Sequence, residues 1–440
     1  MTQAFRGVWA IALGLCAAAR VAAIEGDPDP AFGGNGQLTI QRPAGWPTST
    51  NPTGDAAALS DGRFLWTMSN EGTGVWVGRA FHDGAADTAF GSDGSGHVTL
   101  TDCSDFSTAR LLAEPDGGAI VWSGACLLRL AADGSIDPLF GGTPLPQAEF
   151  LASSLARDHA GRFLLAGSAQ QQWRVFRFTS DGALDTSFGD SGEATITVPA
   201  TNAYRELFAM AIRDDNRIVL AGWRGNSHGP NLVVAQLDTA GDPDPTWNSS
   251  GLVDLEAPTG QSGIEATAVA IDTDGSVVVG GFSNSGSVGC CLLLLRFDPN
   301  GVPITNIILF PLEDATLTSF FESRDTLTVL PDGKLLFATT AFPDFDPTFS
   351  RRTQFILVRA NADGSLDPSF GDGRGWRGYT IDDPTASGQS GDYDQLHAMV
   401  YAQGSALMFG RTFFEDNSNG LDYVSMVRAT FDALFADGFE

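Results

Sequence analysis

The chain repeats one stretch of nine residues, Asp363-Gly364-Ser365-Leu366-Asp367-Pro368-Ser369-Phe370-Gly371. Three more copies follow the same pattern, Asp-Gly-x-x-Asp-x-x-Phe-Gly, at residues 83–91, 133–141 and 181–189. Looser copies lie at residues 26–33 and 241–247. We call this motif the box. Its Asp-Gly pair is typical of a tight turn, its Phe of an apolar plug, and its last Gly of a bend in the backbone.

Each of the seven repeats contains an apolar run, which we name strand c. Runs of four to seven apolar and β-branched residues bounded by turn signals predict buried strands. Six of the seven copies end in arginine, and the exception ends in glutamine. The final residues of the seven runs are Arg79, Arg129, Arg177, Gln236, Arg296, Arg359 and Arg428.

A tight turn between two further apolar runs, strands a and b, precedes every strand c. Asp-Gly between two such runs predicts a hairpin with a type I′ turn, which needs positive φ at both central residues. The seven turns are Asp61-Gly62, Asp116-Gly117, Ala160-Gly161, Asp215-Asn216, Asp274-Gly275, Asp332-Gly333 and Gln403-Gly404. The short run after each box is strand d.

Four antiparallel strands repeated seven times at a period near 60 residues predict an all-β, seven-bladed β-propeller. A β-helix would need much shorter repeats, and a β-sandwich would not need seven similar turns. Residues 24–440 are expected to form this single domain. The run at residues 36–40 has no preceding strands a, b and c of its own, so we expect it to complete the last blade and remove the open edges.

The second Asp of the box lies eight residues beyond the strand-c arginine in four repeats, which predicts ion pairs that pin the turn to the strand. The pairs are Arg79 with Asp87, Arg129 with Asp137, Arg177 with Asp185, and Arg359 with Asp367, and the accompanying plugs are Phe90, Phe140, Phe188 and Phe370. Closure of the ring predicts a further pair, Arg428 with Asp29. Partly exposed pairs are worth only about 0–1 kcal/mol each, so their role is expected to be mainly geometric. The fifth repeat keeps Gly301 but lacks the second Asp and the Phe, so its blade is expected to be the least regular.

The formal net charge is −28, which disfavours nucleic acids and anionic membrane surfaces as partners. Residues 1–23 have the character of a signal peptide, with Arg6 at the start, an apolar run over residues 8–19 and small residues at 21–23. We therefore expect export to the periplasm, the cell surface or the medium. No later stretch is long and apolar enough to span a bilayer, and we expect a monomer without membrane insertion.

Four cysteines follow the predicted cleavage site. Cys103 and Cys126 fall in one repeat and could form a disulfide. Cys290 and Cys291 are adjacent and could form only a strained vicinal bridge or stay reduced. None has the spacing of a metal site, so all four are interpreted as structural.

Calcium binding is an alternative interpretation of the aspartate-rich turns. Residues 272–275 and 344–346 contain fragments of a calcium-loop pattern, but neither has the alternating ligand set with a closing Glu. We therefore expect no cofactor, and calcium remains the open alternative.

The box and its upstream arginine strand resemble the delta-60 repeat family of exported bacterial β-propeller proteins, over essentially all of residues 24–440. The resemblance implies the propeller fold. It implies no activity, because no catalytic residues or ligand are general to that family.

The sequence contains no recognisable catalytic constellation. Five histidines are scattered over different repeats, and no phosphate-binding loop opens a helix. In a four-stranded antiparallel blade, the a–b turns and boxes share one end, and the b–c and d–a loops share the other. The loops vary in length and composition, so we expect binding there. We call the end with the a–b turns and boxes the box end. We call the end with the b–c and d–a loops the loop end.

Aromatic residues in or beside those loops could stack on sugars or anchor a protein, or could pack beneath their own loops. The candidates are Trp46, Trp223, Phe342, Phe345, Phe413 and Phe414. The leading hypothesis is an exported, non-enzymatic binding or surface-interaction module for a protein or a carbohydrate. The alternative is a secreted hydrolase or lyase with carboxylates at the mouth of the central channel.

Overall fold

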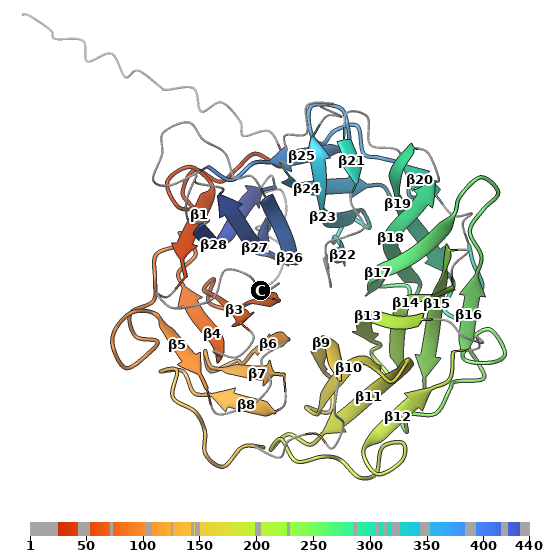
Figure 1. The fold of residues 1–440 in the computed structure, drawn as a ribbon, viewed down its shortest axis with the longest axis horizontal. Helices are drawn as coiled ribbons and strands as arrows, with labels where there is room; N and C mark the ends of the chain where they lie inside the picture. Colours follow the sequence, from red (N-terminus) through yellow and green to blue (C-terminus); the bar gives the residue numbers. More distant parts are fainter. Residues whose placement is uncertain are drawn as a thin grey trace, which may run out of the picture.

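The structure is a computed structural model that describes sixteen stretches of the chain. They are residues 25–42, 53–70, 74–101, 108–124, 126–141, 145, 150–198, 204–226, 229–285, 288–304, 308–310, 315–317, 326–343, 353–382, 393–414 and 421–431. The described residues form strands and turns and contain no helix. Figure 1 shows seven blades arranged around a central axis, which confirms the predicted all-β, seven-bladed propeller.

The first four blades follow the chain in order. Blade 1 consists of β2 (Gly54–Ala58), β3 (Phe64–Asn70), β4 (Gly74–Ala80) and β5 (His97–Leu100). The described part of blade 2 consists of β6 (Ala109–Ala113), β7 (Ala119–Ser123) and β8 (Leu127–Leu130). Blade 3 consists of β9 (Leu151–Arg157), β10 (Phe163–Ala169), β11 (Gln172–Phe178) and β12 (Glu193–Ile196). Blade 4 consists of β13 (Tyr204–Ile212), β14 (Ile218–Asn226), β15 (Gly229–Leu237) and β16 (Leu252–Leu255).

The remaining blades include one bridging strand and the closure. Blade 5 consists of β17 (Gly263–Ile271), β18 (Val277–Ser285), β19 (Val288–Phe297) and β20 (Ile308–Phe310). Blade 6 consists of β22 (Leu327–Val329), β23 (Leu335–Pro343), β24 (Gln354–Ala360) and β25 (Trp376–Tyr379). Blade 7 consists of β26 (Tyr393–Ala402), β27 (Ser405–Phe414), β28 (Leu421–Thr430) and β1 (Gln37–Gln41). The short β21 (Ala315–Leu317) pairs with both β19 and β23 and so joins blades 5 and 6.

The ring closes as the sequence predicts. Strand β1 pairs antiparallel with β28, from Gln37 opposite Val427 to Gln41 opposite Tyr423. In Figure 1 the red N-terminal strand lies beside the blue strands of blade 7. The pairing places the first described strand of the chain at the outer edge of its last blade.

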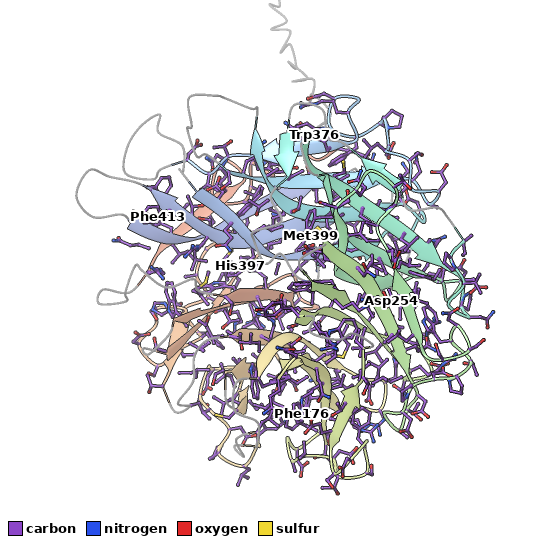
Figure 2. All side chains as sticks on the ribbon, turned by 45° about the vertical axis from the view of Figure 1, so that its right-hand side comes forward. Phe176, Asp254, Trp376, His397, Met399 and Phe413 are labelled. Atoms are coloured by element: carbon purple, nitrogen blue, oxygen red, sulfur yellow. The ribbon has the colours of Figure 1, made fainter. Side chains whose placement is uncertain are left out.

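Strand a is the innermost strand of each blade, and Figure 2 places His397 and Met399 of β26 toward the middle of the molecule. The middle strands are buried on both faces because each blade packs between two others. Every residue of β4 and of β24 is buried. This matches the near-continuous apolar runs of the sequence, which are typical of strands covered on both sides.

The a–b connections are hairpins, but most are not type I′ turns. Positive φ at two successive residues occurs only at Gln403 and Gly404 among the a–b turns of the described residues. In the other six turns one residue alone, Gly62 for example, has positive φ. The predicted hairpins are therefore confirmed, whereas the predicted turn type is correct only in blade 7.

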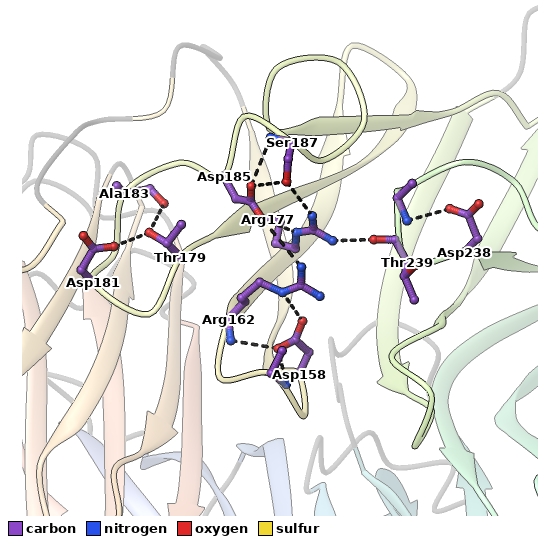
Figure 3. Close-up of polar contacts among 12 residues, drawn as sticks. Asp158, Arg162, Arg177, Thr179, Asp181, Ala183, Asp185, Ser187, Asp238 and Thr239 are labelled. Atoms are coloured by element: carbon purple, nitrogen blue, oxygen red, sulfur yellow. Dashed lines mark hydrogen bonds and ion pairs between the residues drawn. The ribbon is translucent and has the colours of Figure 1, made fainter.

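Contacts of the box join it to strand c of its own blade and to the next blade. In blade 3, Arg177 Nε lies 2.8 Å from Asp185 Oδ2, and Arg177 Nη1 donates to the carbonyl of Thr239 in blade 4 at 2.6 Å. The plug Phe188 lies under the guanidinium, 4.4 Å from Cζ to the ring centroid. Figure 3 shows the polar contacts of Arg177 and Asp185. Arg162 is a second cation, with its Nη1 3.9 Å from Asp185 Oδ2. A single arginine thus joins a box carboxylate, an aromatic plug and the neighbouring blade.

The predicted ion pairs form in three of the four full boxes and at the closure. Nε to Oδ2 measures 2.7 Å for Arg79 and Asp87, 2.7 Å for Arg359 and Asp367, and 2.8 Å for Arg428 and Asp29. The arginines also lie over their plugs, with Arg79 4.8 Å from the Phe90 ring centroid and Arg359 4.9 Å from that of Phe370.

The predicted pair between Arg129 and Asp137 is wrong. Arg129 lies 5.4 Å from the Phe140 ring, but its Nη2 pairs instead with Glu114 Oε2 at 2.7 Å. Glu114 opens the a–b turn of the same blade, and its carboxylate is buried, so it competes successfully for the guanidinium. Blade 5, which lacks the box Asp, uses the same turn position, because Arg296 pairs with Asp272.

Two departures from the motif are compensated. Gln236 donates to Asp244 Oδ2 at 2.6 Å and accepts from Arg213 Nε at 2.6 Å, so Arg213 supplies the missing guanidinium. The fifth box keeps its backbone turn, with Ile304 N–H donating to the Arg296 carbonyl at 2.8 Å. Loss of the second Asp and the Phe therefore leaves the turn itself intact.

Cys126 is disulfide-bonded, and the predicted partner Cys103 lies outside the described residues. Cys291 is free and half-buried. The structure thus has the reduced form of Cys291 rather than a vicinal bridge.

Candidate functional site

The six predicted aromatic residues fall into three groups. Trp46 and Phe345 lie outside the described residues. The backbone of Phe342 is part of β23, opposite Thr316 of β21, and its side chain is not described. Trp223, Phe413 and Phe414 can be placed in full.

Phe413 and Phe414 are neighbours in β27 with different surroundings. Phe414 is only 5% exposed and packs edge-on against Tyr423, with the ring centroids 5.4 Å apart. Phe413 is half-buried and lies at the end of β27, as Figure 2 shows. Successive side chains of a strand point to opposite faces, so one of the two is in the core and the other is near solvent.

Trp223 belongs to a polar and aromatic strip on blade 4. It is half-buried in β14 and lies directly opposite Glu206 of β13, while Tyr204 lies opposite Gly225. Directly opposed residues share one face of a sheet, and diagonal neighbours such as Tyr204 and Trp223 are about 7–8 Å apart. Tyr204 is 68% exposed, and Glu206 is also exposed. We call these three residues the blade-4 strip.

The position of the strip is set by a bulge and by two glycines. The β13–β14 register shifts between Leu207 and Ala209, and a Cβ on Gly222 would lie 2.1 Å from the Glu206 carbonyl. A Cβ on Gly225 would lie 2.7 Å from the Trp223 ring. Bulges of this kind re-aim side chains at the ends of strands. Glycine is therefore needed at both positions for the backbone and the indole to take this arrangement.

The strip faces away from blade 3. Arg205, on the opposite face of β13, donates to the carbonyl of Gln171 in blade 3 at 3.2 Å. A Cβ on Gly222 would also contact Trp173 of blade 3 at 2.8 Å. Side chains alternate between faces, so Tyr204, Glu206 and Trp223 are on the blade-5 side of blade 4, at the loop end.

Carboxylates also occur at equivalent positions on the inner strands of blades 4 and 5. Glu265 of β17 precedes a bulge as Glu206 does, and its carbonyl lies 1.9 Å from where a Cβ on Gly281 would be. Glu206 is exposed and Glu265 is half-buried. These are the carboxylates on which a channel-mouth reaction would depend.

Asp55 is a third inner-strand carboxylate, and it links two blades. Burial raises the pKa of Asp55 to about 6, although the charge of Arg110 and two backbone N–H groups oppose the shift. Oδ2 accepts from Leu111 N–H of blade 2 at 2.9 Å, and Oδ1 accepts from Ala56 N–H at 2.8 Å. A carboxylate held in this way by backbone groups acts as a structural link between β2 and β6.

The box aspartates lie at the box end and form hydrogen bonds and ion pairs within the protein. Burial alone would raise the pKa of Asp87, but hydrogen bonds from Arg63, Ala89 and Arg79 outweigh it and hold the pKa below its usual value. The pKa of Asp244 is held at about 2, against burial, by hydrogen bonds from Thr246, Gln236 and Arg217. These carboxylates are charged at neutral pH and bonded within the protein.

Within the described residues, no group of three or more His, Cys, Asp or Glu side chains is arranged to hold a metal ion. The same residues include no helix that is long and apolar enough to cross a membrane.

Three stretches match the family model described as "Domain of unknown function (DUF5122) beta-propeller". They are residues 160–188, 213–246 and 330–370, and each runs from an a–b turn into a box. The repeating unit of this chain is therefore that of a β-propeller repeat family. No curated protein matches the chain.

Solved structures that resemble the chain are distant. An endo-arabinase from Bacteroides thetaiotaomicron is 16% identical over 64% of this chain and 93% of its own, with a TM-score of 0.36. A gluconolactonase from Xanthomonas campestris is 13% identical over 89% and 99%, with a TM-score of 0.39. The NanB sialidase from Streptococcus pneumoniae is 10% identical over 89% and 70%, with a TM-score of 0.42. Likeness at this level carries no argument about activity.

Proposed function

We propose that this protein is an exported, non-enzymatic binding module that recognises a carbohydrate or a protein surface with its loop end. The observation that carries the proposal is the blade-4 strip, in which an exposed tyrosine, a half-buried tryptophan and an exposed glutamate share one face. Aromatic faces bury apolar area at low entropic cost, and a nearby carboxylate accepts hydrogen bonds from hydroxyl or amide groups.

The side chains of the box end also favour a binding site at the loop end, because they are used within the fold. Its arginines and most of its aspartates bond to one another and to neighbouring blades, so they serve the scaffold. Binding residues are commonly placed on loops and strand ends held by such a rigid frame. The proposed protein acts as a monomer, without a cofactor, and belongs to the delta-60 repeat group that its boxes resemble.

Glycan-array and pull-down screening of residues 24–440 tests the proposal. Tyr204→Ala and Trp223→Ala are expected to reduce the affinity for the captured ligand at least tenfold, because each removes an aromatic contact. Leu139→Ala is the matched control, because Leu139 is 90% exposed in the box of blade 2. Binding that survives both aromatic substitutions, or that is lost in Leu139→Ala, would overturn the assignment to the loop end.

A second candidate function, a hydrolase or lyase, rests on the equivalent positions of Glu206 and Glu265. Paired carboxylates are the usual acid and base of glycoside cleavage. If this is the function, Glu206→Gln and Glu265→Gln will each abolish turnover of a polysaccharide while leaving its binding intact. A ligand that is bound and recovered unchanged by both the natural protein and these variants supports the binding module.

A further inference from the structure

The blade-4 strip of Tyr204, Glu206 and Trp223 places aromatic rings and carboxylate oxygens side by side. Trp223 lies directly opposite Glu206, and side chains paired in this way have Cβ atoms about 4.5–5.5 Å apart. Tyr204 comes two residues before Glu206 on the same face of β13, which separates them by about 7 Å along the strand. The three side chains therefore lie within the span of one sugar ring and its hydroxyl groups.

The Trp223 indole presents carbon atoms rather than its N–H group. Its Nε1 is buried and has no hydrogen-bond partner among the described residues. A Cβ on Gly225 would lie 2.7 Å from Cζ3 and 3.1 Å from Cε3, so the benzene ring of the indole leans over Gly225. Gly225 is itself directly opposite Tyr204. The half-buried indole is thus an apolar platform beside the exposed tyrosine.

Blade 5 bounds the platform on its outer side. Pro230 of β15 lies opposite Gly225, and a Cβ on Gly263 of blade 5 would lie 2.1 Å from Pro230 Cδ. Leu232, which lies opposite Trp223 in β15, is fully buried. The platform is therefore closed toward strand c and open toward strand a, where the other two residues of the strip are exposed.

The charge of the strip disfavours acidic ligands. On this face of β13, β14 and β15, Glu206 is the charged residue among those that the structure describes. Arg205 and Arg224 lie opposite each other on the other face. There Arg205 Nε donates to the Val198 carbonyl at 2.8 Å, and Arg224 Nε lies 2.5 Å from Asp254 Oδ2. An anionic ligand on the strip would therefore meet a carboxylate of like charge.

The apolar surface around the strip is small. Among the described residues, Tyr204 is the exposed large hydrophobic side chain of blade 4. Leu151 begins β9 of blade 3, and the others lie in or beside boxes: Phe81, Ile136, Leu139, Val302 and Ile304. A protein interface of standard size buries about 800 Å² on each partner around its aromatic anchors. Two neighbouring aromatic residues and one carboxylate match a sugar ring better than such an interface.

We propose that the blade-4 strip is a glycan site that takes a neutral pyranose and discriminates against acidic sugars. The apolar C–H face of the sugar packs on the Trp223 indole, and the edge of the sugar contacts Tyr204. Glu206 accepts hydrogen bonds from hydroxyl groups of the sugar, since a carboxylate has several acceptor positions. The site rests on the proposed function, because it gives a ligand class to the strip that carries that function. Glu206 is then the residue that sets the charge specificity.

One polysaccharide in two charge states tests the selection. A glycan array of neutral, uronic and sialylated glycans first identifies the neutral glycan that the protein binds best. Calorimetry then compares this glycan with its C6-oxidised form, in which the primary hydroxyl groups have become carboxylates. We expect the oxidised form to bind at least about tenfold more weakly, because Glu206 repels the added charge. Equal binding of the two forms, or array binding confined to acidic glycans, would overturn the proposal.

Three variants, each checked for folding by its Tm, assign the effect to the strip. Trp223→Ala removes the platform, and Gly225→Ala displaces the indole with a methyl group at a position whose φ is not positive. Each should weaken binding of the neutral glycan at least about tenfold, whereas Leu139→Ala at the box end should leave it unchanged. Glu206→Gln keeps an acceptor oxygen, so it should alter that affinity by less than about threefold and bring the oxidised form within the same range. An unchanged preference in Glu206→Gln would contradict the role of this carboxylate.

The ligand class and the proposed function fail in different ways. If the protein binds no neutral glycan but captures a protein partner and loses it in Trp223→Ala, the proposed function stands and the glycan assignment is wrong. If a captured ligand of either class binds equally well to Tyr204→Ala and Trp223→Ala, the proposed function itself is wrong. A change in tryptophan emission on glycan binding that disappears in Trp223→Ala supports stacking on this indole, and the same change in that variant would contradict it.

Discussion

Asp87 and Asp137 occupy the same position in successive boxes, yet only Asp87 is bound by arginines. Asp87 is 3% exposed and is paired with both Arg79 and Arg63. Asp137 is half-buried, and its Oδ1 accepts a backbone hydrogen bond from Leu139 at 2.9 Å. The same residue in the same motif is thus expected to contribute differently to stability. The difference arises because Glu114 pairs with Arg129 and leaves Asp137 without an arginine partner.

This difference predicts the outcome of two matched substitutions. Asp87→Asn leaves two guanidinium groups without their shared carboxylate and should lower the free energy of unfolding by about 2–4 kcal/mol. Asp137→Asn should change it by less than about 0.5 kcal/mol, as is usual for substitutions away from such networks. Urea unfolding of both variants at pH 7 measures this, and equal losses would show that the pairing carries no stability.

The box turn is the element that joins neighbouring blades. The last residue of one box donates its backbone N–H to a carbonyl at the start of the next box, as in Gly33 to Asp83 at 2.9 Å and Gly91 to Asp133 at 2.9 Å. The plug of one box also packs on the turn glycine of the next. A Cβ on Gly241 would lie 2.8 Å from the Phe188 ring of the preceding blade.

A pair of glycine substitutions separates this packing from backbone strain. Gly241 has φ +97° and contacts Phe188, whereas Gly161 has φ +81° and nothing within 4 Å of its added Cβ. Gly161→Ala should cost about 1 kcal/mol for the left-handed backbone alone. Gly241→Ala should cost about 2 kcal/mol more, because the methyl group displaces the plug. Equal losses of unfolding free energy in the two variants would show that contact with the plug does not stabilise the packing of neighbouring blades.

The sequence predicted the elements better than it predicted the partners of individual side chains. Strand order, hairpins and closure follow from local apolar runs and from turn residues that recur in every repeat. The second cation was missed because Arg63 and Asp87 are 24 residues apart and belong to different motifs. One signal was available, since arginine or lysine follows the a–b turn residue Gly62, Gly161, Asn216 or Gly333 in four repeats.

The candidate site was harder to predict for a related reason. Trp223 lies beside a loop in the sequence and could be predicted, whereas Tyr204 begins a strand and gains its exposure from its place at the loop end. Phe414 was also predicted, but it is buried because of the face of β27 that it occupies. Exposure of an aromatic residue near a loop is a property of the folded blade and cannot be read from residue type.

The whole molecule is a ring whose first and last described strands, β1 and β28, pair in blade 7. The N-terminal segment is bonded to blade 7 through β1 and to blade 6 through Arg377, whose Nη1 lies 2.6 Å from Asp27 Oδ1, and through Tyr379, whose hydroxyl donates to the Gly26 carbonyl at 2.6 Å. The N-terminal segment thereby joins blades 6 and 7 at the box end. The central claim is that the pair of Arg428 and Asp29 holds the N-terminal box on β28 and so closes blade 7, as the other box pairs hold each turn on its own strand.

A double-mutant cycle on these two residues, which are 399 positions apart, tests that claim most directly. We predict that Asp29→Asn and Arg428→Gln each lower the free energy of unfolding, and that the double variant loses about 1–3 kcal/mol less than the sum of the two single losses. Gln is a suitable replacement because Gln236 stands at this position in blade 4. Additive losses, within about 0.3–0.5 kcal/mol, would contradict closure through this pair.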